Sequence, residues 1–472
     1  MESPGVSDEE EFFDAFETTE QMRSSSSSAE SQWFKFSDVL SHTGSEGNQS
    51  ENSHNPFYDS TPRISLSDFS SPRISLSEYS TYNSTSHKEP DLLPNPSIRN
   101  IIKKQHKDFF EFAESEKIQV IDIDENIHNK IWILKFSPDG RFLAVGGENP
   151  DIKLYEVSKQ RPYGPQNLFC EIPYNVMKGH NRMVLDISWA RGSGFFLSAG
   201  EDWNVFIWGI GDSRPLLQFK HPEAVTCACF HPVNANYFLT GCNDKTIRVW
   251  NIPSYALISS TKTPELITAG AFTPNGDLIL IGCLHGQVLM YEPCIEMNLL
   301  TQINCKNSWG RKKAGRKVTG FDFLDDEQVL IATNDSRMRL YNLKDFTLKQ
   351  KYKGFVNEKF PLKPNFSHNL IHVISGSENG NIYLWNTYCT WAPKINPIFS
   401  RKKNFKNYSY EYFPVSKNKS FCSAAFAPDK IVKDVQNRNK RARSDSIVTH
   451  IMVVACEGKL QVFYNKFRIA GM

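Results

Sequence analysis

Two adjacent phenylalanines inside a dense acidic run form the pattern with the most specific chemistry in this sequence. The run reads EFFDAFE over residues 11–17, and it follows SDEE at residues 7–10. Exposed aromatic rings are unfavourable in water unless a partner buries them, whereas the surrounding carboxylates attract a basic surface. The pattern therefore predicts a short binding motif, in which charge steers the encounter and a phenyl ring fills an apolar pocket.

The same string resembles the FFAT motif, two phenylalanines in an acidic tract, which docks on the MSP domain of VAP-type receptors of the endoplasmic reticulum. The resemblance implies that Phe12 fills the receptor pocket, that Asp14 pairs with a receptor base and that Ala15 fits a tight site. The motif is also matched by Glu11, Phe13 and Glu17. The alternative interpretation is a transient apolar cluster within an acidic tail.

Residues 1–97 have the composition of a disordered tail. They contain 24 serines and carry a net charge of −12, whereas the rest of the chain carries +14. Such a segment cannot bury enough apolar surface to offset the entropy lost on ordering. We therefore expect a disordered acidic tail in front of a basic folded body.

Further binding or modification sites are predicted within this tail. Residues 61–70 and 71–80 are near copies, and their candidate phosphorylation sites are Thr61, Ser65, Ser71 and Ser75. A phosphate adds about −1.5 to −2 charge and could switch docking; an unmodified spacer is the alternative. Asn55-Pro56-Phe57 resembles the NPF ligand of EH-domain proteins, which makes such a protein a further candidate partner.

Patterns typical of catalysis are absent from the sequence. It contains no G-x-S-x-G elbow, no phosphate-binding loop, no G-x-G-x-x-G opening a helix and no H-E-x-x-H. Its ten cysteines include no C-x-x-C pair, which favours free buried thiols over a zinc module or a disulfide framework. We expect no enzyme activity, cofactor or metal. Because no signal peptide or membrane-spanning stretch is evident, we expect a cytoplasmic protein with only peripheral membrane association.

From residue 131 onward the sequence repeats a pattern of short strands. The seven copies span residues 131–157, 183–210, 224–252, 267–291, 318–343, 369–386 and 421–464, the last split by a polar insertion. Nearly every copy has an alternating strand ending in an aromatic residue, then a buried strand, a turn and a strand ending in Trp or Tyr. Short strands with such turns predict antiparallel sheets. A period near 50 residues, closed by W-N or Y-N, is typical of a WD-repeat β-propeller.

The expected fold is therefore all-β, a seven-bladed WD-repeat β-propeller over residues 118–468. The disordered acidic tail (1–97) precedes it, and residues 98–117 form a linker segment between the two. A propeller must close its ring to avoid exposed sheet edges. Residues 118–123 (IQVIDI) alternate in polarity and have no copy of their own, so we expect them to complete the last blade beside residues 459–464.

Polar residues in two copies match the internal hydrogen-bond set of a WD blade. They are His180, Ser198, Asp202 and Trp208 in the second copy and His221, Thr240, Asp244 and Trp250 in the third. Their expected role is to satisfy buried polar groups across strands rather than to bind a ligand or act as a base.

Basic residues concentrate in three runs, at residues 311–317, 401–403 and 437–443. The first run contains Arg311, Lys312, Lys313, Arg316 and Lys317. The first two runs join successive copies, so we expect them on one face of the propeller and the third run on the opposite face. Such charge suits an acidic protein or lipid phosphates, and the scarcity of interleaved aromatics argues against nucleic acid.

Segments of the body resemble the rabphilin-like family of Rab-binding WD-repeat proteins. The segments are residues 309–319, 334–343, 351–357 and 376–388, and the resemblance runs from about residue 98 to the C-terminus. The family implies an effector of a recycling-endosome Rab GTPase that also binds VAP receptors. The tail is shorter here than the family's N-terminal region, where much of the Rab binding is placed. Residues 98–123 are therefore the candidate Rab contact.

These observations together predict a non-enzymatic adaptor in membrane trafficking. The FFAT-like motif would dock on the endoplasmic reticulum, and the propeller region would dock on a Rab GTPase or lipid of an endosomal or Golgi membrane. The alternative is a scaffold subunit of a nuclear or ubiquitin-ligase complex with a phosphoregulated tail. The two hypotheses differ in whether Phe12 matters for function.

Overall fold

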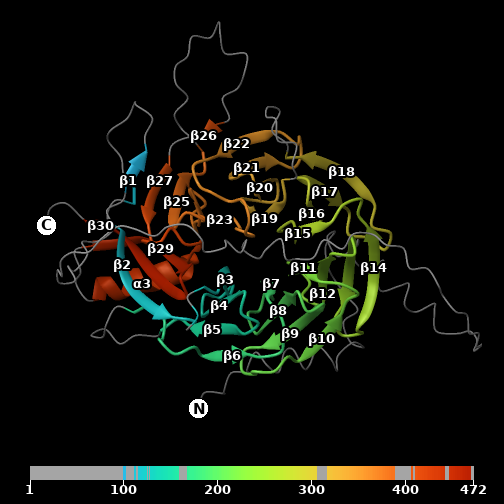
Figure 1. Ribbon diagram of the computed structural model, residues 1–472, viewed down its shortest axis with the longest axis horizontal. Coiled ribbons are helices and arrows are strands. Elements are labelled where there is room, and N and C mark those ends of the chain that lie inside the picture. Colours follow the sequence, from blue (N-terminus) through green and yellow to red (C-terminus); the bar gives the residue numbers. More distant parts are fainter. Residues whose placement is uncertain are drawn as a thin grey trace, which may run out of the picture.

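Seven antiparallel sheets surround a central axis in the computed structural model, each forming one blade of a propeller (Figure 1). The structure describes residues 99–101, 111–112, 115–124, 126, 128–158, 167–305, 316–388, 406–407, 410–441 and 446–468. The prediction of a seven-bladed propeller is confirmed. The tail predicted to be disordered, residues 1–97, lies outside the described residues.

The first four blades are four-stranded sheets, and their strands follow one another from the axis outward. Blade one contains β3 (Ile131–Phe136), β4 (Phe142–Gly147), β5 (Ile152–Glu156) and β6 (Asn175–Met177). Blade two contains β7 (Val184–Trp189), β8 (Phe195–Gly200), β9 (Asn204–Gly209) and β10 (Leu217–Lys220). Blade three contains β11 (Val225–Phe230), β12 (Tyr237–Cys242), β13 (Thr246–Asn251) and β14 (Ala256–Lys262). Blade four contains β15 (Ile267–Phe272), β16 (Ile279–Cys283), β17 (Gln287–Tyr291) and β18 (Leu299–Asn304).

The last three blades each include a strand from a distant part of the chain. Blade five contains β19 (Val318–Phe323), β20 (Gln328–Thr333), β21 (Arg337–Asn342), β22 (Leu348–Tyr352) and the short parallel β26 (Lys406–Asn407). Blade six contains β23 (Asn365–Phe366), β24 (His372–Ser375), β25 (Asn381–Asn386), β27 (Tyr410–Pro414) and β1 (Arg99–Ile101). Blade seven contains β28 (Cys422–Phe426), β29 (Ser446–Cys456), β30 (Lys459–Arg468) and β2 (Ser115–Asp122).

The ring is closed by β2, which pairs antiparallel with β30 and places Ile121 opposite Leu460. Figure 1 shows the cyan β2 beside the red end of the chain, as the pattern of residues 118–123 predicts. Part of the predicted linker 98–117 also belongs to the sheets. Its residues Arg99–Ile101 form β1 on the edge of blade six, and Phe112 is buried at 1% exposure between blades six and seven.

Neighbouring blades are linked through the second residue of their innermost strands. Five innermost strands, β3, β7, β11, β15 and β19, have a register shift at this position. A bulge of this kind leaves the residue unpaired with the neighbouring strand and turns its side chain in another direction. Thr226 Oγ1 donates to the carbonyl of Ile267 at 3.0 Å, and Thr268 Oγ1 donates to that of Val318 at 2.7 Å. Because each acceptor is the first residue of the next innermost strand, these strands run parallel around the ring.

The core lies between the sheets, since each blade is apolar on both faces near the axis. All six residues of β4 are buried, whereas the outer strand β14 has one buried residue, Ser259, among exposed and partly buried ones. Buried clusters combine residues of adjacent blades, as in the set that includes Trp132 of blade one and Trp208 of blade two. A continuous apolar sequence is therefore expected near the axis and an alternating one at the rim.

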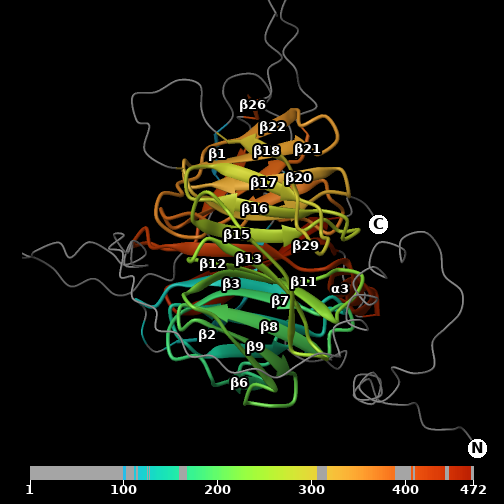
Figure 2. The ribbon, with the colours of Figure 1, turned by 90° about the vertical axis from the view of Figure 1, so that its right-hand side faces the viewer.

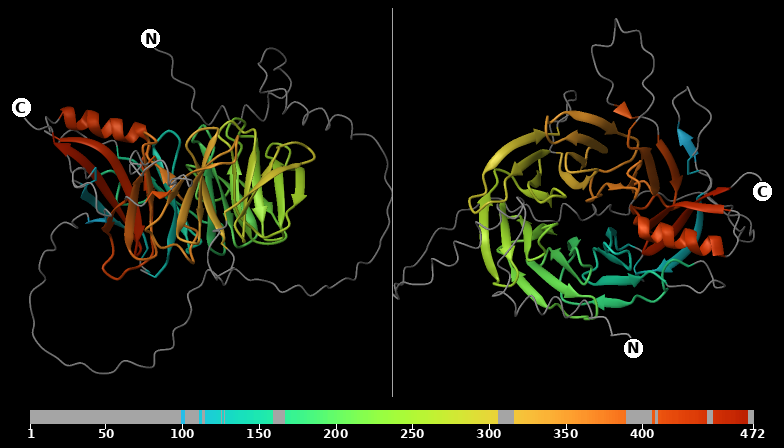
Figure 3. Two further views of the ribbon diagram at one scale, coloured as in Figure 1. Left: turned by 90° about the horizontal axis from the view of Figure 1, so that it is seen from above. Right: turned by 180° about the vertical axis from the view of Figure 1, so that it is seen from behind.

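The disc has two faces (Figures 2 and 3). Within a blade, the turn between the first and second strands and the turn between the third and fourth strands lie on one face. The turn between the second and third strands lies on the other face, together with the link to the next blade. The polar insertion in the last blade contains a helix, α3 (Asp429–Arg441), which follows the first strand β28. We call its side the α3 face, visible in Figure 3, and the opposite side the linker face. No helix among the described residues is long and apolar enough to cross a membrane.

The structure agrees with one prediction about the basic runs and corrects another. Residues 437–441 belong to α3, in which Ile431, Val432 and Val435 bury an apolar stripe against blade seven, so they lie on the opposite face from the link that carries Arg316 and Lys317, as expected. Residues 401–403 lie outside the described residues, in the stretch of chain between β25 and β27, which are neighbours in blade six. The short β26 in the same stretch pairs with β22 of blade five. The run therefore belongs to the connection between the third and fourth strands of blade six and not to a link from blade six to blade seven.

Candidate partner-binding site

The predicted hydrogen-bond set of blade two is present. His180 Nε2 lies 2.6 Å from Ser198 Oγ, its Nδ1 lies 2.9 Å from an Asp202 oxygen, and Trp208 Nε1 donates to Ser198 Oγ at 2.8 Å. Burial opposes ionisation of Asp202, but its hydrogen bonds, above all that from His180, hold its pKa below the usual value. The four side chains satisfy one another, which fits the structural role expected of them.

Blade three keeps only part of this set. His221 Nε2 and Trp250 Nε1 both contact Thr240 Oγ1, at 3.0 and 3.1 Å. Asp244 instead pairs with Arg248, so its predicted contact with His221 is wrong. The reason lies in one position of the third strand: Phe206 in blade two packs on His180, whereas blade three has Arg248, a charged partner that attracts the carboxylate.

The centre of the propeller is filled by the loop between β22 and β23, residues 353–364. Lys363 of this loop forms an ion pair with Asp186 of β7, and Thr319 Oγ1 donates to the carbonyl of Leu362 at 2.7 Å. The remaining cavity has a volume of about 120 Å³, and Lys135, Asp186 and Lys363 contribute to its lining. Burial, followed by the nearby charge of Lys363, lowers the pKa of Lys135. No sequence pattern indicates this loop, because its contacts lie in other blades.

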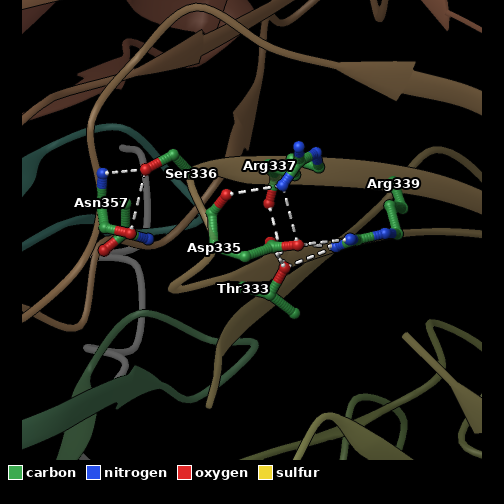
Figure 4. Close-up of polar contacts among 6 residues, drawn as sticks. All are labelled: Thr333, Asp335, Ser336, Arg337, Arg339 and Asn357. Atoms are coloured by element: carbon green, nitrogen blue, oxygen red, sulfur yellow. Dashed lines mark hydrogen bonds and ion pairs between the residues drawn. The ribbon is translucent and has the colours of Figure 1, made fainter. Parts of the chain in front are cut away.

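Polar residues on the linker face of blade five form a compact network (Figure 4). Asp335, in the turn between β20 and β21, accepts hydrogen bonds from Arg339 Nη2 at 2.6 Å and Arg337 Nη1 at 3.2 Å. Thr333 Oγ1 donates to the other Asp335 oxygen at 2.5 Å. The Arg339 side chain is 1% exposed and that of Arg337 26%. One carboxylate thus holds two guanidinium groups at different depths.

More cations surround this network. Lys351 of β22 lies directly opposite Arg339 of β21 in the antiparallel register. Burial, then Arg339, Arg337 and Lys353, lower the pKa of Lys351 to about 8, and Asp335 opposes them. Lys353 follows the end of β22, and its carbonyl accepts a hydrogen bond from Trp385 Nε1 at 3.0 Å.

The end of the predicted basic run at residues 311–317 lies beside the Asp335 network. The carbonyl of Lys317 accepts a hydrogen bond from the backbone N–H of Asn334 at 2.9 Å, directly before Asp335 in the turn. Arg316 precedes it in the link from blade four. We call Arg316, Lys317, Arg337, Arg339, Lys351 and Lys353 the blade-five basic cluster. Arg311, Lys312 and Lys313 lie outside the described residues.

The turn that carries this cluster is fixed to the central loop. Ser336 has a left-handed backbone, with φ of 58°, which costs energy for a residue other than glycine. Its N–H donates to the carbonyl of Asn357 at 3.2 Å, and its Oγ accepts from the N–H of Asn357 at 3.0 Å. Figure 4 shows Asn357 beside this turn. The cluster is therefore presented by a rigid scaffold.

The remaining predicted sites fall outside the described residues. They are the FFAT-like motif at residues 11–17, the NPF string at residues 55–57 and the phosphorylation sites Thr61, Ser65, Ser71 and Ser75. Within the described part of the chain, no group of three or more His, Cys, Asp or Glu side chains is arranged to hold a metal ion.

Three segments match the WD40 family model, described as WD domain, G-beta repeat, at residues 124–156, 172–209 and 213–251. These segments contain β3 to β13, that is, all strands of blades one and two and the first three strands of blade three. The chain is a seven-bladed propeller that contains WD40 repeats. The propeller domain of Cps50 (Swd1) from Myceliophteria thermophila has the same fold, with a TM-score of 0.53 and 14% identity over 74% of this chain and 99% of that one.

This WD40 propeller is similar to WD repeat-containing protein 44 of Xenopus laevis, with 30% identity over 322 residues. It is also 28% identical over 280 residues to an uncharacterized WD repeat-containing protein of Schizosaccharomyces pombe. The matches cover 58% and 54% of this chain but 35% and 47% of those relatives. The chain thus spans less than half the length of either relative, and the similarity supports the family resemblance found in its sequence.

Proposed function

We propose that this WD40 propeller is a non-enzymatic adaptor that tethers the endoplasmic reticulum to an endosomal or Golgi membrane. The observation that carries the proposal is the FFAT-like string at residues 11–17, in a chain whose propeller is similar to WD repeat-containing protein 44. In this scheme Phe12, Asp14 and their flanking residues bind the MSP domain of a VAP-type receptor. The propeller region, with residues 98–117 in front of it, contacts a recycling-endosome Rab GTPase.

The scaffold role is supported by what the polar groups of the propeller do. Asp186 is engaged by Lys363, Asp202 by His180, and Asp335 by two arginines. These carboxylates stabilise the fold, and the central loop that fills the channel leaves the outer surfaces for partners. A rigid disc with several exposed faces suits a protein that brings other molecules together.

The reach of the tether follows from the length of chain between its two ends. About 80 residues separate the motif from β1 (Arg99–Ile101), the first segment held in the propeller, so a flexible chain of that length would have a typical span of about 50 Å and a taut limit near 270 Å. A short motif of this kind is expected to bind at about micromolar affinity and to gain from simultaneous engagement at the second membrane.

The test is a titration of the full-length chain against a purified VAP MSP domain, beside the Phe12→Ala and Asp14→Ala variants. We expect about micromolar binding that both substitutions abolish and that weakens as salt rises, because the acidic flank steers association. A Phe16→Ala variant serves as the control, since Phe16 is not among the matched positions. Unchanged binding in Phe12→Ala would contradict the proposal and favour a scaffold subunit indifferent to this residue.

The proposed contact with a Rab GTPase is tested in a separate experiment. The full-length chain is offered to a recycling-endosome Rab loaded with GDP or with a non-hydrolysable GTP analogue. Binding that prefers the GTP form supports an effector role. Equal capture of both forms would contradict the effector role, and capture of neither form would leave the chain with one membrane partner and contradict the tether.

A further inference from the structure

We propose that an exposed apolar surface on the outer rim of blades three and four is a docking site for residues 33–36 of the same chain, which read WFKF. The surface consists of five side chains that we call the rim patch: Tyr255, Leu257, Ile295, Leu299 and Leu300. Residues 33–36 lie outside the described residues. Three features support the contact: the patch itself, the place where the preceding chain joins the propeller, and the composition of the segment.

The rim patch lies on the outermost strands of two neighbouring blades (Figure 1). Its side chains are between 39% and 53% exposed. The two blades touch at this place, because Ser259 Oγ of β14 donates a hydrogen bond to the carbonyl of Ile295 at 2.6 Å. Tyr255 stacks on Phe219 of β10, with 5.5 Å between ring centroids, and Leu299 begins β18. Single exposed apolar side chains are common on protein surfaces, whereas a group of them on adjoining strands marks an interaction site.

Outer strands of two other blades are covered by further segments of the chain. The short β26 pairs with β22 of blade five, and β1 pairs with β27 of blade six. In contrast, β14 and β18 are the last strands of their sheets, so no described segment pairs with their outer edges. An uncovered outer strand with exposed apolar side chains favours association with another segment. The rim patch is thus a surface of the same kind without a described cover.

The chain in front of the propeller joins it at the rim. Arg99–Ile101 form β1 at the outer edge of blade six, beside Tyr410–Pro414. Residues 37–98 separate this strand from Phe36, and a flexible chain of about 60 residues has a typical span of about 43 Å. A domain of about 350 residues has a radius of gyration of about 20 Å. The segment can therefore reach blades three and four without being stretched.

The segment supplies apolar surface of a matching kind. Residues 33–36 contain three aromatic side chains, Trp33, Phe34 and Phe36, and aromatic side chains bury about 150–250 Å² each. Such rings are unfavourable in water unless something covers them. The rings and the rim patch would cover one another, which removes apolar area from water on both sides of the contact.

Charge distinguishes this segment from the acidic aromatic string at residues 11–17. Glu292 precedes and Glu296 follows Ile295 in the turn between β17 and β18, and neither carboxylate has an ion-pair partner among the described residues. Lys35 is the only charged residue of 33–36 and complements these carboxylates, whereas residues 11–17 would be repelled by them. The patch therefore favours residues 33–36 as its occupant.

Docking would shorten the tether proposed above. Residues 18–32 alone would then separate the FFAT-like motif from a segment held on the propeller. A flexible chain of about 15 residues spans about 21 Å, instead of about 50 Å for the whole tether. This consequence depends on the proposed function, whereas the contact between residues 33–36 and the rim patch does not.

The experiment is hydrogen exchange of the full-length chain, read by mass spectrometry in peptides that contain residues 33–40. The test variant is Leu257→Ser with Leu299→Ser. The control is Leu370→Ser with Ile371→Ser, which removes two similarly exposed aliphatic side chains from the turn between β23 and β24 of blade six. Melting temperatures establish that both variants fold, and light scattering at two protein concentrations establishes their oligomeric state.

A tethered segment has an effective concentration of about 1 mM, so a contact with a dissociation constant of about 0.1 mM slows exchange about 10-fold. We expect this protection in the wild-type chain and in the control, and its loss in the test variant. Rapid exchange of residues 33–40 in the wild-type chain, or equal protection in the test variant and the control, would overturn the inference. Protection that appears only as a dimer forms would assign the patch to a second copy and overturn the intramolecular contact.

A charge reversal tests the choice of segment. Lys35→Glu should reduce the protection of residues 33–40, and the further substitutions Glu292→Lys and Glu296→Lys should restore it. A loss that the reversed patch does not restore would overturn the charge complementarity that selects this segment. Neither experiment contains an MSP domain, so a failed contact with the rim patch and a failed FFAT-like motif are told apart.

Discussion

Lys363 and Asp186 form an ion pair across the centre of the propeller, although 177 residues separate them in the chain. Asp186 belongs to the innermost strand of blade two, and Lys363 to the loop between blades five and six. Both side chains are largely buried, with 8% and 21% exposure. The pair therefore ties opposite parts of the ring together, and its removal should be felt by the whole fold.

Replacing Lys363 by Met is expected to lower the free energy of unfolding by about 3 kcal/mol, because it leaves the Asp186 carboxylate buried without its cation. Urea denaturation measures this change. Lys359→Met in the same loop is the control, since Lys359 is exposed. The further substitution Asp186→Asn should recover part of the loss; a double variant as unstable as the sum of both single variants would argue against a direct coupling.

The free energy of unfolding is expected to decrease as the pH falls, because of a histidine cluster between blades six and seven. His450 lies 4.8 Å from His372 and 5.2 Å from His368 between ring centroids, and neither of its ring nitrogens has a hydrogen-bond partner among the described residues. Burial, followed by these two neighbours, lowers the pKa of His450 to about 3. Glu111 faces His372, and Asp429 and Lys433 of α3 act on His368.

The direction of this pH effect follows from the difference in the pKa of His450 between the two states. In the unfolded state His450 is protonated near pH 6.5, whereas in the native state it is protonated only near pH 3. The contribution of His450 is fully present above pH 6.5 and is lost as the pH falls, by up to about 1.4 kcal/mol per pH unit. Urea midpoints between pH 7 and pH 5 measure it. His450→Leu should flatten this dependence, and His285→Leu, at an exposed position, should not; the same slope in both variants would refute the assignment.

Phe112 is expected to anchor the segment in front of the propeller. Its ring lies 5.0 Å from His372 and 6.3 Å from Phe426 between centroids, and Glu411 accepts hydrogen bonds from the backbone N–H groups of residues 111 and 112. Phe112→Ala should cost about 3 kcal/mol or release the segment locally. Hydrogen exchange of Arg99–Ile101 distinguishes the two outcomes. Unaltered exchange and stability would show that Phe112 does not hold the segment.

Closure of the ring can be tested at two adjacent residues of β2. Ile121 is 3% exposed, whereas Val120, on the other face of the strand, is 43% exposed. Ile121→Lys should detach β2 from β30 and lower the melting temperature by several degrees, because it buries an unpaired charge. Val120→Lys should change it little. A similar decrease in melting temperature in both variants would mean that ring closure does not depend on the packing of Ile121.

The sequence by itself determined the parts of the protein that depend on local pattern. Seven copies of a strand pattern predict seven blades, and the alternation in residues 118–123 predicts the closing strand, because strand formation depends on period and turn chemistry within a few residues. The set around His180 was also identified from its spacing. The binding string at residues 11–17 remains a prediction from the sequence alone, since it lies outside the described residues.

Tertiary structure alone decided which distant residues meet. Nothing local indicates that Lys363 reaches Asp186, that Lys351 lies opposite Arg339, or that Asp244 prefers Arg248 to His221. Likewise, only the pairing of β25 with β27 assigns residues 401–403 to a connection within one blade. Such contacts depend on strand register and on competition between charged partners, and a repeat pattern does not specify either. Of the blade-five basic cluster, only Arg316 and Lys317 belong to a basic run in the sequence, and the other four residues are assigned to it by the pairing of β21 with β22.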